Sequence, residues 1–329
     1  MDAWTSAMMR GDFAAAWETS DAVLLQRSAA GTLHDAAQPR HLQAIWNGDP
    51  FTGKRVLVRC YHGLGDTIQF VRLLPLLRAR CASVTLWVQP ALMELLRGCG
   101  GADRLEPLHE GEPEIERDLD IELMELPHAL RLTIDAIPAR VPYIHVRSAR
   151  GAGSRRAPGI GLCWLSGDWN PARSISRNLL RPLARMPGVR WSSLQYPALP
   201  HPFPMFDLGC RDLRVFAQRL QRLDLVISVD TVVAHLAGAL GLPVWLLLPE
   251  TCDWRWMRAR PDSPWYPTMR LFRQRRAGRW GEVVGEIASA LPEYSSSPRR
   301  RRAANPAPLA GPRHRPMHGR NDAATRGST

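Results

Sequence analysis

The stretch DLVISVDTVVAHLAGALGLPVWLLL, residues 224–248, holds the pattern that decides the fold of this chain. An apolar run at 225–229 predicts a buried strand, and a helix is predicted to follow over 231–241 and to end at Gly241. A second apolar run at 243–248 predicts the next strand. Strand, helix and strand in this order form a right-handed crossover unit of a parallel sheet. This part of the chain therefore predicts an α/β fold.

The same alternation of strands and helices runs through most of the chain on either side of that stretch. Further strands are predicted at 55–60, 84–88, 160–164 and 189–195, and further helices at 66–80, 90–99, 213–223 and 278–291. The segment RSARGAGSRRAPG at 147–159 interrupts the alternation and has the composition of a linker. We therefore expect two α/β domains, over residues 46–155 and 156–292.

Residues 1–45 are predicted to be helical, with apolar residues spaced for one buried face. The first helix is expected to break at Gly11, and the next to restart at Asp12, which can cap it. GDFAAAW at 11–17 resembles the second half of a tetratricopeptide repeat, although no second copy follows after 34 residues. A repeat-like leader and an amphipathic leader packed on the next domain both remain open.

The composition is that of a globular protein, with 45% hydrophobic residues in 329. No apolar run is long enough to cross a bilayer, and the first residues lack the basic and apolar regions of a signal peptide. We therefore expect a cytoplasmic location. Six cysteines are scattered without C-x-x-C spacing, which argues against a disulfide framework and a structural zinc site.

The net charge of +12 comes largely from the end of the chain. Residues 299–329 carry eight arginines and one acidic residue, Asp322. The arginine and proline content of 293–329 predicts a disordered tail. Such a tail could contact an anionic membrane or nucleic acid, or could be a solvated extension without function. The rest of the chain carries a net charge of only +5, so no specific nucleic-acid partner is expected.

The segment CYHGLGDTIQF at 60–70 predicts a ligand loop between a strand and a helix. Gly63 and Gly65 allow a ligand to approach the backbone, and the helix expected to start at Asp66 offers unpaired N–H groups. The alternative is structural, because Asp66 and Gln69 have the spacing of a capping box. A dinucleotide fingerprint is excluded because its third glycine position holds Ile68.

The quoted stretch at 224–248 predicts a second loop of this kind. Asp230 is expected to cap the helix, which would leave the N–H groups of Thr231 and Val232 at the carboxyl edge of the sheet, where open α/β folds bind ligands. His235 lies four residues after Thr231 and so on the same side of the helix. A hydrogen-bonded histidine tucked under the sheet is the alternative for His235.

HGLGDTIQF at 62–70, ISVDTVVAHLAGALGLPVWLLLP at 227–249, and DWRW and SPWYP after it together resemble the ADP-heptose:lipopolysaccharide heptosyltransferase family, glycosyltransferase family 9. The resemblance covers roughly residues 40–291, and the variant is similar to one often found after tetratricopeptide repeats. It implies a GT-B fold, in which two Rossmann-like parallel-sheet domains face each other across a cleft. The C-terminal domain of such a fold is expected to hold a sugar nucleotide.

The resemblance also implies a reaction and roles for residues. A glycosyltransferase would move a sugar from a nucleotide-diphospho sugar to an acceptor hydroxyl of a glycan, a lipopolysaccharide core or a protein, by a metal-independent inverting displacement without a cofactor. Asp66 would be the base. Asp230, Thr231, Val232 and His235 would surround the diphosphate and the sugar. A catalytically inactive binding module with the same fold is the alternative.

Other candidate site residues lie in two loops of the C-terminal half. The family binds phosphate through a basic residue after the strand at 160–164, where this chain has no lysine; Arg173 and Arg177 are the substitutes, and Ser166 could add contacts. In the loop at 249–267, Asp253 and Arg255 could lie near the phosphates. The aromatic residues of this loop either stack on the ligand or cover the end of the sheet: Trp254, Trp256, Trp265 and Tyr266.

One acidic motif is interpreted as structural. The sequence DLD at 118–120 matches the D-x-D pattern with which glycosyltransferases of another fold bind a metal. Because it opens an apolar run in the N-terminal half, we expect it to be the beginning of a strand.

Overall fold

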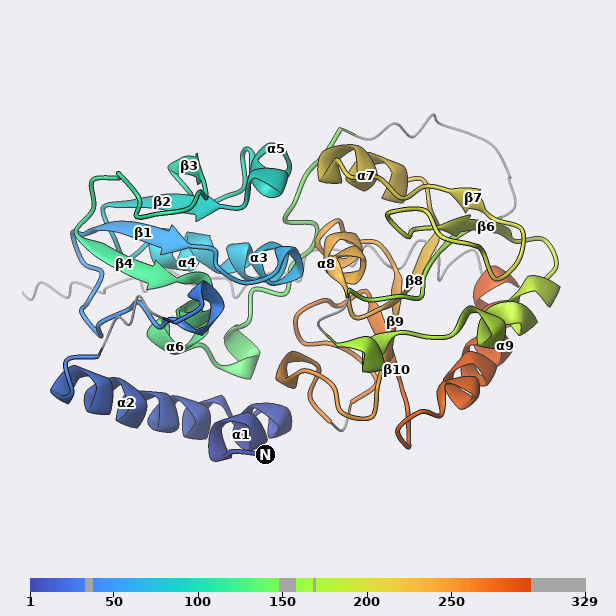
Figure 1. Ribbon diagram of the computed structural model, residues 1–329, viewed down its shortest axis with the longest axis horizontal. Coiled ribbons are helices and arrows are strands. Elements are labelled where there is room, and N and C mark those ends of the chain that lie inside the picture. Colours follow the sequence, from blue (N-terminus) through green and yellow to red (C-terminus); the bar gives the residue numbers. More distant parts are fainter. Residues whose placement is uncertain (33–37, 148–157, 168–169, 259, 297–329) are drawn as a thin grey trace, which may run out of the picture.

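The computed structural model describes residues 1–32, 38–147, 158–167, 170–258 and 260–296. These residues form two parallel sheets, one in each half of the chain, that lie side by side in Figure 1. The predicted α/β class and the division into two sheet-containing halves are confirmed. Within the described residues, no helix combines the length and apolar character that crossing a bilayer requires.

The N-terminal sheet has the order β3-β2-β1-β4. Its strands are β1 (Arg55–Arg59), β2 (Ser83–Val88), β3 (Arg104–Pro107) and β4 (Leu119–Glu122). In the central strand β1, Val58 is in register with Leu86 and Ile121, and all three are fully buried. Helices follow the strands: α3 (Leu64–Phe70) and α4 (Leu74–Arg78) after β1, α5 (Met93–Leu96) after β2, and α6 (Leu126–Ala129) after β4.

The C-terminal sheet has the order β10-β9-β8-β5-β6-β7. Its strands are β5 (Gly159–Cys163), β6 (Arg190–Ser193), β7 (Phe206–Asp207), β8 (Leu225–Val229), β9 (Val244–Leu248) and β10 (Met269–Arg273). The strands of the quoted stretch, β8 and β9, are buried at every position, because other elements cover both faces of the sheet.

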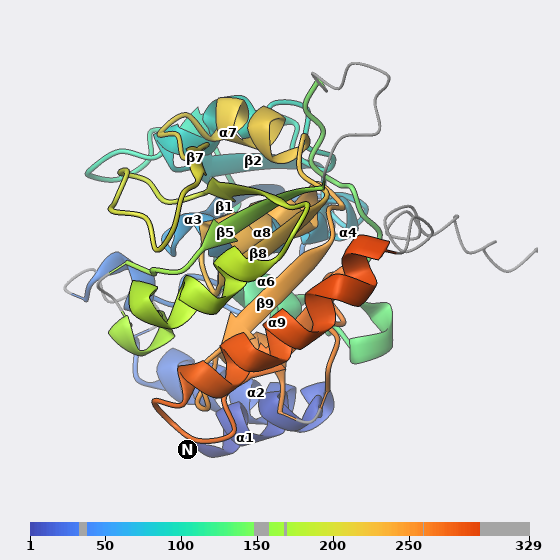
Figure 2. The same ribbon diagram turned by 90° about the vertical axis from the view of Figure 1, so that its right-hand side faces the viewer.

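Helices cover the two faces of the C-terminal sheet. They are α7 (Leu213–Leu220), α8 (Val232–Ala239) and α9 (Trp280–Ser296). Helix α9 lies across one face of the sheet (Figure 2), and buries Val283, Val284 and Ile287 against the strands. This helix was expected to end at residue 291, but it continues through Pro292 to Ser296. The remainder of the expected tail, from residue 297, lies outside the described residues.

The leader forms two helices, α1 (Ala3–Arg10) and α2 (Phe13–Ala29). As predicted, the chain turns at Gly11, whose φ is 78°, and Asp12 caps α2 by accepting the N–H of Ala15 at 3.2 Å. The expected helix does not reach residue 45, because residues 38–45 contain only the short 3-10 turn at 40–42. Residues 33–37 lie outside the described part of the chain.

The leader packs against both domains. On the N-terminal domain, Trp17 Nε1 donates to the carbonyl of Leu132 at 2.7 Å. On the C-terminal domain, the Met9 carbonyl accepts the N–H of Arg258 at 3.1 Å, and the ring centroids of Trp4 and Trp254 are 5.6 Å apart. These contacts are those of a packed leader, whereas a relation to tetratricopeptide repeats stays a prediction.

Helices α3 and α8 pack against each other between the two sheets (Figure 1). Gly65 of α3 permits this contact, since a Cβ atom there would lie only 2.8 Å from Cδ2 of His235 on α8. Nearby, the N–H of Tyr143 donates to the carbonyl of Ala239 at 3.1 Å. The loops that follow β1 and β8 are thereby brought face to face.

Candidate active site

A cavity of about 770 Å³ lies between the two domains, at the carboxyl ends of β1 and β8. Residues from both domains line it: His41, Tyr61, His62, Gly63, Leu64, Gly65, Asp66, Met124, Ser166, Gly167, Arg173, Asp230, Thr231, Val232, His235, Asp253, Trp254 and Arg255. The structure thus brings together every predicted site residue except Arg177. Arg177 begins a 3-10 segment, Arg177–Arg185, and is not part of this lining.

The loop after β1 differs in detail from the prediction. Helix α3 begins at Leu64 with Gly63 as its N-cap, so Asp66 is the third residue of the helix rather than its start. Oδ2 of Asp66 accepts the N–H of Gly63 at 2.9 Å, which caps the helix from its first turn. The predicted capping box between Asp66 and Gln69 is wrong, because Gln69 points into the protein and is fully buried.

Asp66 also forms an ion pair across the two domains. Its Oδ1 lies 2.6 Å from Nη1 of Arg255, and the two side chains are 23% and 7% exposed. Burial alone would raise the pKa of Asp66, but the charge of Arg255, followed by that of His235, outweighs burial and lowers the pKa. Asp66 is therefore ionised and already neutralised by a guanidinium.

The loop after β8 also corrects a predicted cap. Thr231, not Asp230, is the N-cap of α8, and its Oγ1 accepts the N–H of Val233 at 3.3 Å. Asp230 was expected to cap because the helix was predicted to start directly after it, at Thr231. Asp230 is the one residue between the end of β8 at Val229 and the cap at Thr231, and its carboxylate is buried in the protein.

The buried carboxylate of Asp230 is held by three side chains. Trp256 Nε1 donates to its Oδ2 at 3.0 Å, Arg173 Nη1 lies 3.4 Å from the same oxygen, and His235 Nε2 lies 3.5 Å from Oδ1. Burial opposes ionisation of Asp230, but the hydrogen bond and charge of His235 and the two nearby arginines lower its pKa to about 2. Asp230 therefore orients groups of the cavity wall as a permanent anion.

His235 combines the two roles that the sequence left open. Its side chain is 4% exposed and its Nδ1 lies 3.0 Å from the hydroxyl of Tyr266, as expected of a buried histidine. The ring also stacks on Trp256, with the ring centroids 5.4 Å apart. It nevertheless lines the cavity, and it forms the contact surface for Gly65 of the other domain.

The aromatic loop at 249–267 mostly covers the end of the sheet. Trp256, Trp265 and Tyr266 are fully buried, and of the aromatic residues of this loop only Trp254 lines the cavity. In the same loop Nε of Arg255 donates a hydrogen bond to Oδ1 of Asp253 at 2.8 Å. The covering interpretation is thus correct for three of the four residues, while Trp254 remains available to a ligand.

Of the two arginines considered for the basic position after β5, Arg173 lines the cavity. Its Nη1 donates to the carbonyl of Asp230 at 3.1 Å, which fastens the loop after β5 to the loop after β8. Ser166 stands beside it, where its backbone N–H donates to Ser174 Oγ at 3.0 Å. Arg173 is therefore part of the cavity wall, and the described lining contains no lysine.

Sequence reasoning missed several residues of the lining, and His62 is one of them. Nδ1 of His62 lies 3.0 Å from Oε1 of Glu122, a buried residue at the end of β4. Burial works against protonation of His62, but Glu122 outweighs it and raises the pKa of the imidazole. The position of His62, directly before Gly63 at the end of a strand, was a usable signal. Tyr61, directly before it, had the same signal, whereas His41 and Met124 had none, since they come from segments distant in the sequence.

The described residues contain no group of three or more His, Cys, Asp or Glu side chains that could hold a metal ion. The DLD motif begins β4, as predicted: Asp118 pairs with Arg55 at 2.7 Å and Asp120 with Arg59 at 2.8 Å. Independence from metal stays a prediction.

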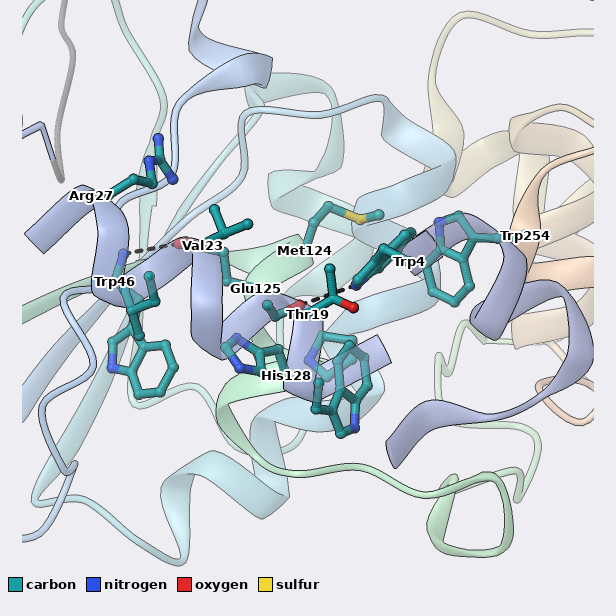
Figure 3. Close-up of a pocket in the computed structure, with 13 residues that line it drawn as sticks. Trp4, Thr19, Val23, Arg27, Trp46, Met124, Glu125, His128 and Trp254 are labelled. Atoms are coloured by element: carbon teal, nitrogen blue, oxygen red, sulfur yellow. Dashed lines mark hydrogen bonds between the residues drawn. The ribbon is translucent and has the colours of Figure 1, made fainter. Parts of the chain in front are cut away.

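A second cavity, of about 260 Å³, lies between the leader and the N-terminal domain. Tryptophans from both form much of its wall, and Figure 3 shows Trp46, His128 and Trp254 around it. The N–H of Trp46 donates to Oε2 of Glu125 at 2.9 Å. Met124 and Trp254 line both cavities, so the leader stands next to the larger cavity between the domains.

Comparison with known sequences finds one curated relative and no matching family model. Protein FlbA of Caulobacter vibrioides is 27% identical over 292 residues, which are 77% of this chain and 48% of FlbA. The chain therefore spans about half the length of this curated relative.

Several solved structures resemble this one. A glycosyl transferase family 9 protein from Veillonella parvula matches with a TM-score of 0.51 and 12% identity, over 74% of this chain and 90% of that one. E. coli ADP-heptose heptosyltransferase II matches with a TM-score of 0.50 and 14% identity, over 73% of this chain and 99% of that one. A third match is TibC of E. coli, a dodecameric iron-containing heptosyltransferase whose structure is in complex with ADP-D-beta-D-heptose. Its TM-score is 0.51 and its identity 12%, over 74% of this chain and 77% of that one. The chain has the GT-B fold of these proteins, and the fold implied by the resemblance is confirmed.

Proposed function

We propose that this protein is a glycosyltransferase that moves a sugar from a nucleotide-diphospho sugar to the hydroxyl of an acceptor. The observation that carries the proposal is the meeting of two loops in one cavity. A carboxylate from the N-terminal domain, Asp66, faces the first turn of α8 and two arginines from the C-terminal domain, Arg173 and Arg255. The fold shared with heptosyltransferases, one of which is complexed with a nucleotide-diphospho sugar, supports this assignment.

The roles proposed for these residues follow from the demands of the reaction. The acceptor oxygen attacks the anomeric carbon, the bond to the diphosphate breaks on the opposite side, and the configuration inverts. Asp66 takes the proton of the acceptor. The N–H groups of Thr231 and Val232 at the start of α8, together with Arg173, stabilise the leaving diphosphate. Because these groups supply the positive charge, we propose that the displacement needs no metal ion and no cofactor.

The other substrate-binding residues support the donor around these groups. Gly63 and Gly65 let it approach the backbone, His235 and Ser166 offer hydrogen bonds, and Trp254 offers a ring face. The acceptor is proposed to be a glycan, a lipopolysaccharide core or a protein, reached in the cytoplasm, with the basic tail in contact with an anionic membrane. The fold does not identify the sugar, the nucleobase or the acceptor.

A non-catalytic sugar-nucleotide-binding or protein-binding module is the second candidate. The ion pair between Asp66 and Arg255 favours it, because a base that is neutralised by a guanidinium is a weak one. The two candidates differ in turnover, since a binding module would retain the donor without consuming it.

The test is a panel of nucleotide sugars, with binding followed by calorimetry and turnover by release of the nucleoside diphosphate. An enzyme should bind one donor and consume it, and Asp66→Asn should lower turnover by at least about a hundredfold, as expected for loss of a general base. Asp118→Asn removes the same charge at the opposite end of β1 and should leave turnover unchanged. Donor binding without turnover in the wild-type protein would favour the binding module.

A further inference from the structure

Asp66 and Arg255 come from different domains, and yet they form the shortest ion pair in the wall of the cavity, at 2.6 Å. A pair with so little access to water is screened weakly, so the contact strongly favours this arrangement of the two side chains. Under the proposed function Asp66 must be free to take the acceptor proton, and the sequence analysis places Arg255 near the phosphates. The pair therefore has to open during the reaction.

The charges of the cavity indicate what opens it. Three aspartates of the lining, Asp66, Asp230 and Asp253, lie within ion-pair distance of its two arginines, Arg173 and Arg255. In the described lining, each guanidinium is therefore already paired with a carboxylate. A diphosphate brings at least two further negative charges. To be neutralised by a guanidinium it must compete with the carboxylate that this guanidinium already faces.

Arg255 can make this exchange at lower cost than Arg173. If Nη1 of Arg255 leaves Asp66, its Nε still donates to Asp253 at 2.8 Å, and Gln69 Oε1 lies 3.1 Å from Nη1. The carboxylate of Asp66, which is 23% exposed, keeps the hydrogen bond that it accepts from the N–H of Gly63. By contrast, withdrawal of Arg173 would break its direct ion pair with Asp230, whose side chain is 5% exposed, and its hydrogen bond to the Asp230 carbonyl at 3.1 Å. An unpaired charge costs more the more deeply it is buried.

We infer that Arg255 is a positioning residue that responds to the donor: the diphosphate of the donor takes Nη1 of Arg255 from Asp66 and so frees the carboxylate to act as base. The inference rests on the proposed function. In the transfer that follows, the acceptor oxygen bonds to the anomeric carbon, its proton passes to Asp66, and the diphosphate leaves with the electron pair of the broken bond beside Arg255. The base thus becomes active only where a donor is bound.

The exchange has a consequence for protons. Three charged or titratable groups face Asp66: Arg255 from the aromatic loop, His235 from α8 and His62 from the loop after β1. Withdrawal of Arg255 removes the largest of the charges that favour the ionised carboxylate, so the pKa of Asp66 rises. Binding of a nucleoside diphosphate near pH 5 should then be accompanied by proton uptake at Asp66.

The test uses ADP, GDP and UDP as probes and calorimetry as the measurement. Asp66→Asn removes the competitor for Arg255, so the variant should bind the preferred nucleoside diphosphate about tenfold more tightly than the wild-type protein. In an Arg255→Gln background, Asp66→Asn should no longer change the affinity. Titrations at pH 5 in two buffers of different ionisation enthalpy should show proton uptake in the wild-type protein that is absent from Asp66→Asn.

Asp118→Asn is the matched control, because it removes one negative charge from an ion pair at the other end of the N-terminal sheet. It should change the affinity less than twofold. Equal or weaker binding by Asp66→Asn, or an equal gain in the Arg255→Gln background, would overturn the inference while the proposed function stands. If none of the three probes binds the wild-type protein, the proposed function fails and the inference fails with it.

Discussion

Asp66 and Asp230 show how two identical carboxyl groups acquire different tasks from their surroundings. Asp230 is held in position by Arg173, Trp256 and His235. The hydrogen bond and charge of His235, with the charges of Arg255 and Arg173, lower its pKa to about 2. Asp66 is more exposed and has one strong partner, Arg255. A carboxylate whose one ion-pair partner can be drawn away by a phosphate is suited to act as a base. One that is held on several sides is suited to orient its neighbours.

Arg173 and Arg177 allow a prediction at the same scale. Arg173 lines the cavity and Arg177 does not, so Arg173→Ala should weaken nucleoside diphosphate binding by about tenfold, the size of one charge-assisted hydrogen bond. Arg177→Ala should change the affinity less than twofold. Calorimetry with ADP, GDP and UDP measures both. Equal losses in the two variants would mean that long-range charge, and not the contact at Arg173, holds the phosphates.

The important elements are α3 and α8, because their contact places Asp66 opposite the first turn of α8. Close approach of two helices requires a small residue where they touch. Gly65 fulfils this requirement, since any side chain there would collide with the ring of His235. The glycine that sequence analysis assigned to ligand approach thus also serves the packing between the domains.

Gly65→Ala tests the contact between these helices. The added methyl would lie 2.8 Å from His235 Cδ2, so we expect a loss of about 1–3 kcal/mol in the free energy of unfolding, together with a loss of turnover. Gly285→Ala is the control, because nothing lies within 4 Å of its Cβ position on the exposed side of α9. That variant should be neutral or gain up to about 1 kcal/mol. Urea denaturation compares the two, and equal stabilities would show that α3 and α8 can move apart freely.

At the scale of the whole molecule, the leader joins the two domains beside the cavity. Helix α2 packs on the N-terminal domain through Trp17, and α1 reaches the loop of Trp254 on the C-terminal domain. Since Trp254 also lines the cavity, the leader supports a wall of the site. It is therefore a part of the folded unit and not an appendage.

Trp17→Ala measures how much the leader contributes. Trp17 is 6% exposed and hydrogen-bonded through Nε1, so its truncation should lower the free energy of unfolding by about 3–5 kcal/mol. Leu25→Ala, on the same helix but 71% exposed, should stay within about 0.5 kcal/mol of the wild-type value. Urea denaturation followed by circular dichroism measures both variants. A Trp17→Ala variant as stable as Leu25→Ala would mean that the leader does not contribute to the folded unit.

The sequence by itself determined most of the strands and the two loops that form the site. Runs such as 225–229 and 243–248 are apolar because both faces of a parallel sheet are covered, and that requirement is visible in any window of a few residues. The carboxyl ends of parallel strands share one edge, so Asp66 and Thr231 could each be placed at the mouth of a sheet before any coordinates. The short strands β7 and β10 had no such signal, because β7 is two exposed residues and two of the five residues of β10 are arginines.

Only the tertiary structure decided which partners these residues meet. The capping predictions for Asp66 with Gln69 and for Asp230 failed because spacing along a helix does not show into which side of the helix a carboxylate turns. Arg255 lies 189 residues from Asp66, and their contact exists because α3 and α8 pack across the two domains. A local pattern reports burial and backbone geometry, whereas the electrostatics of the site depend on distances between segments that fold together.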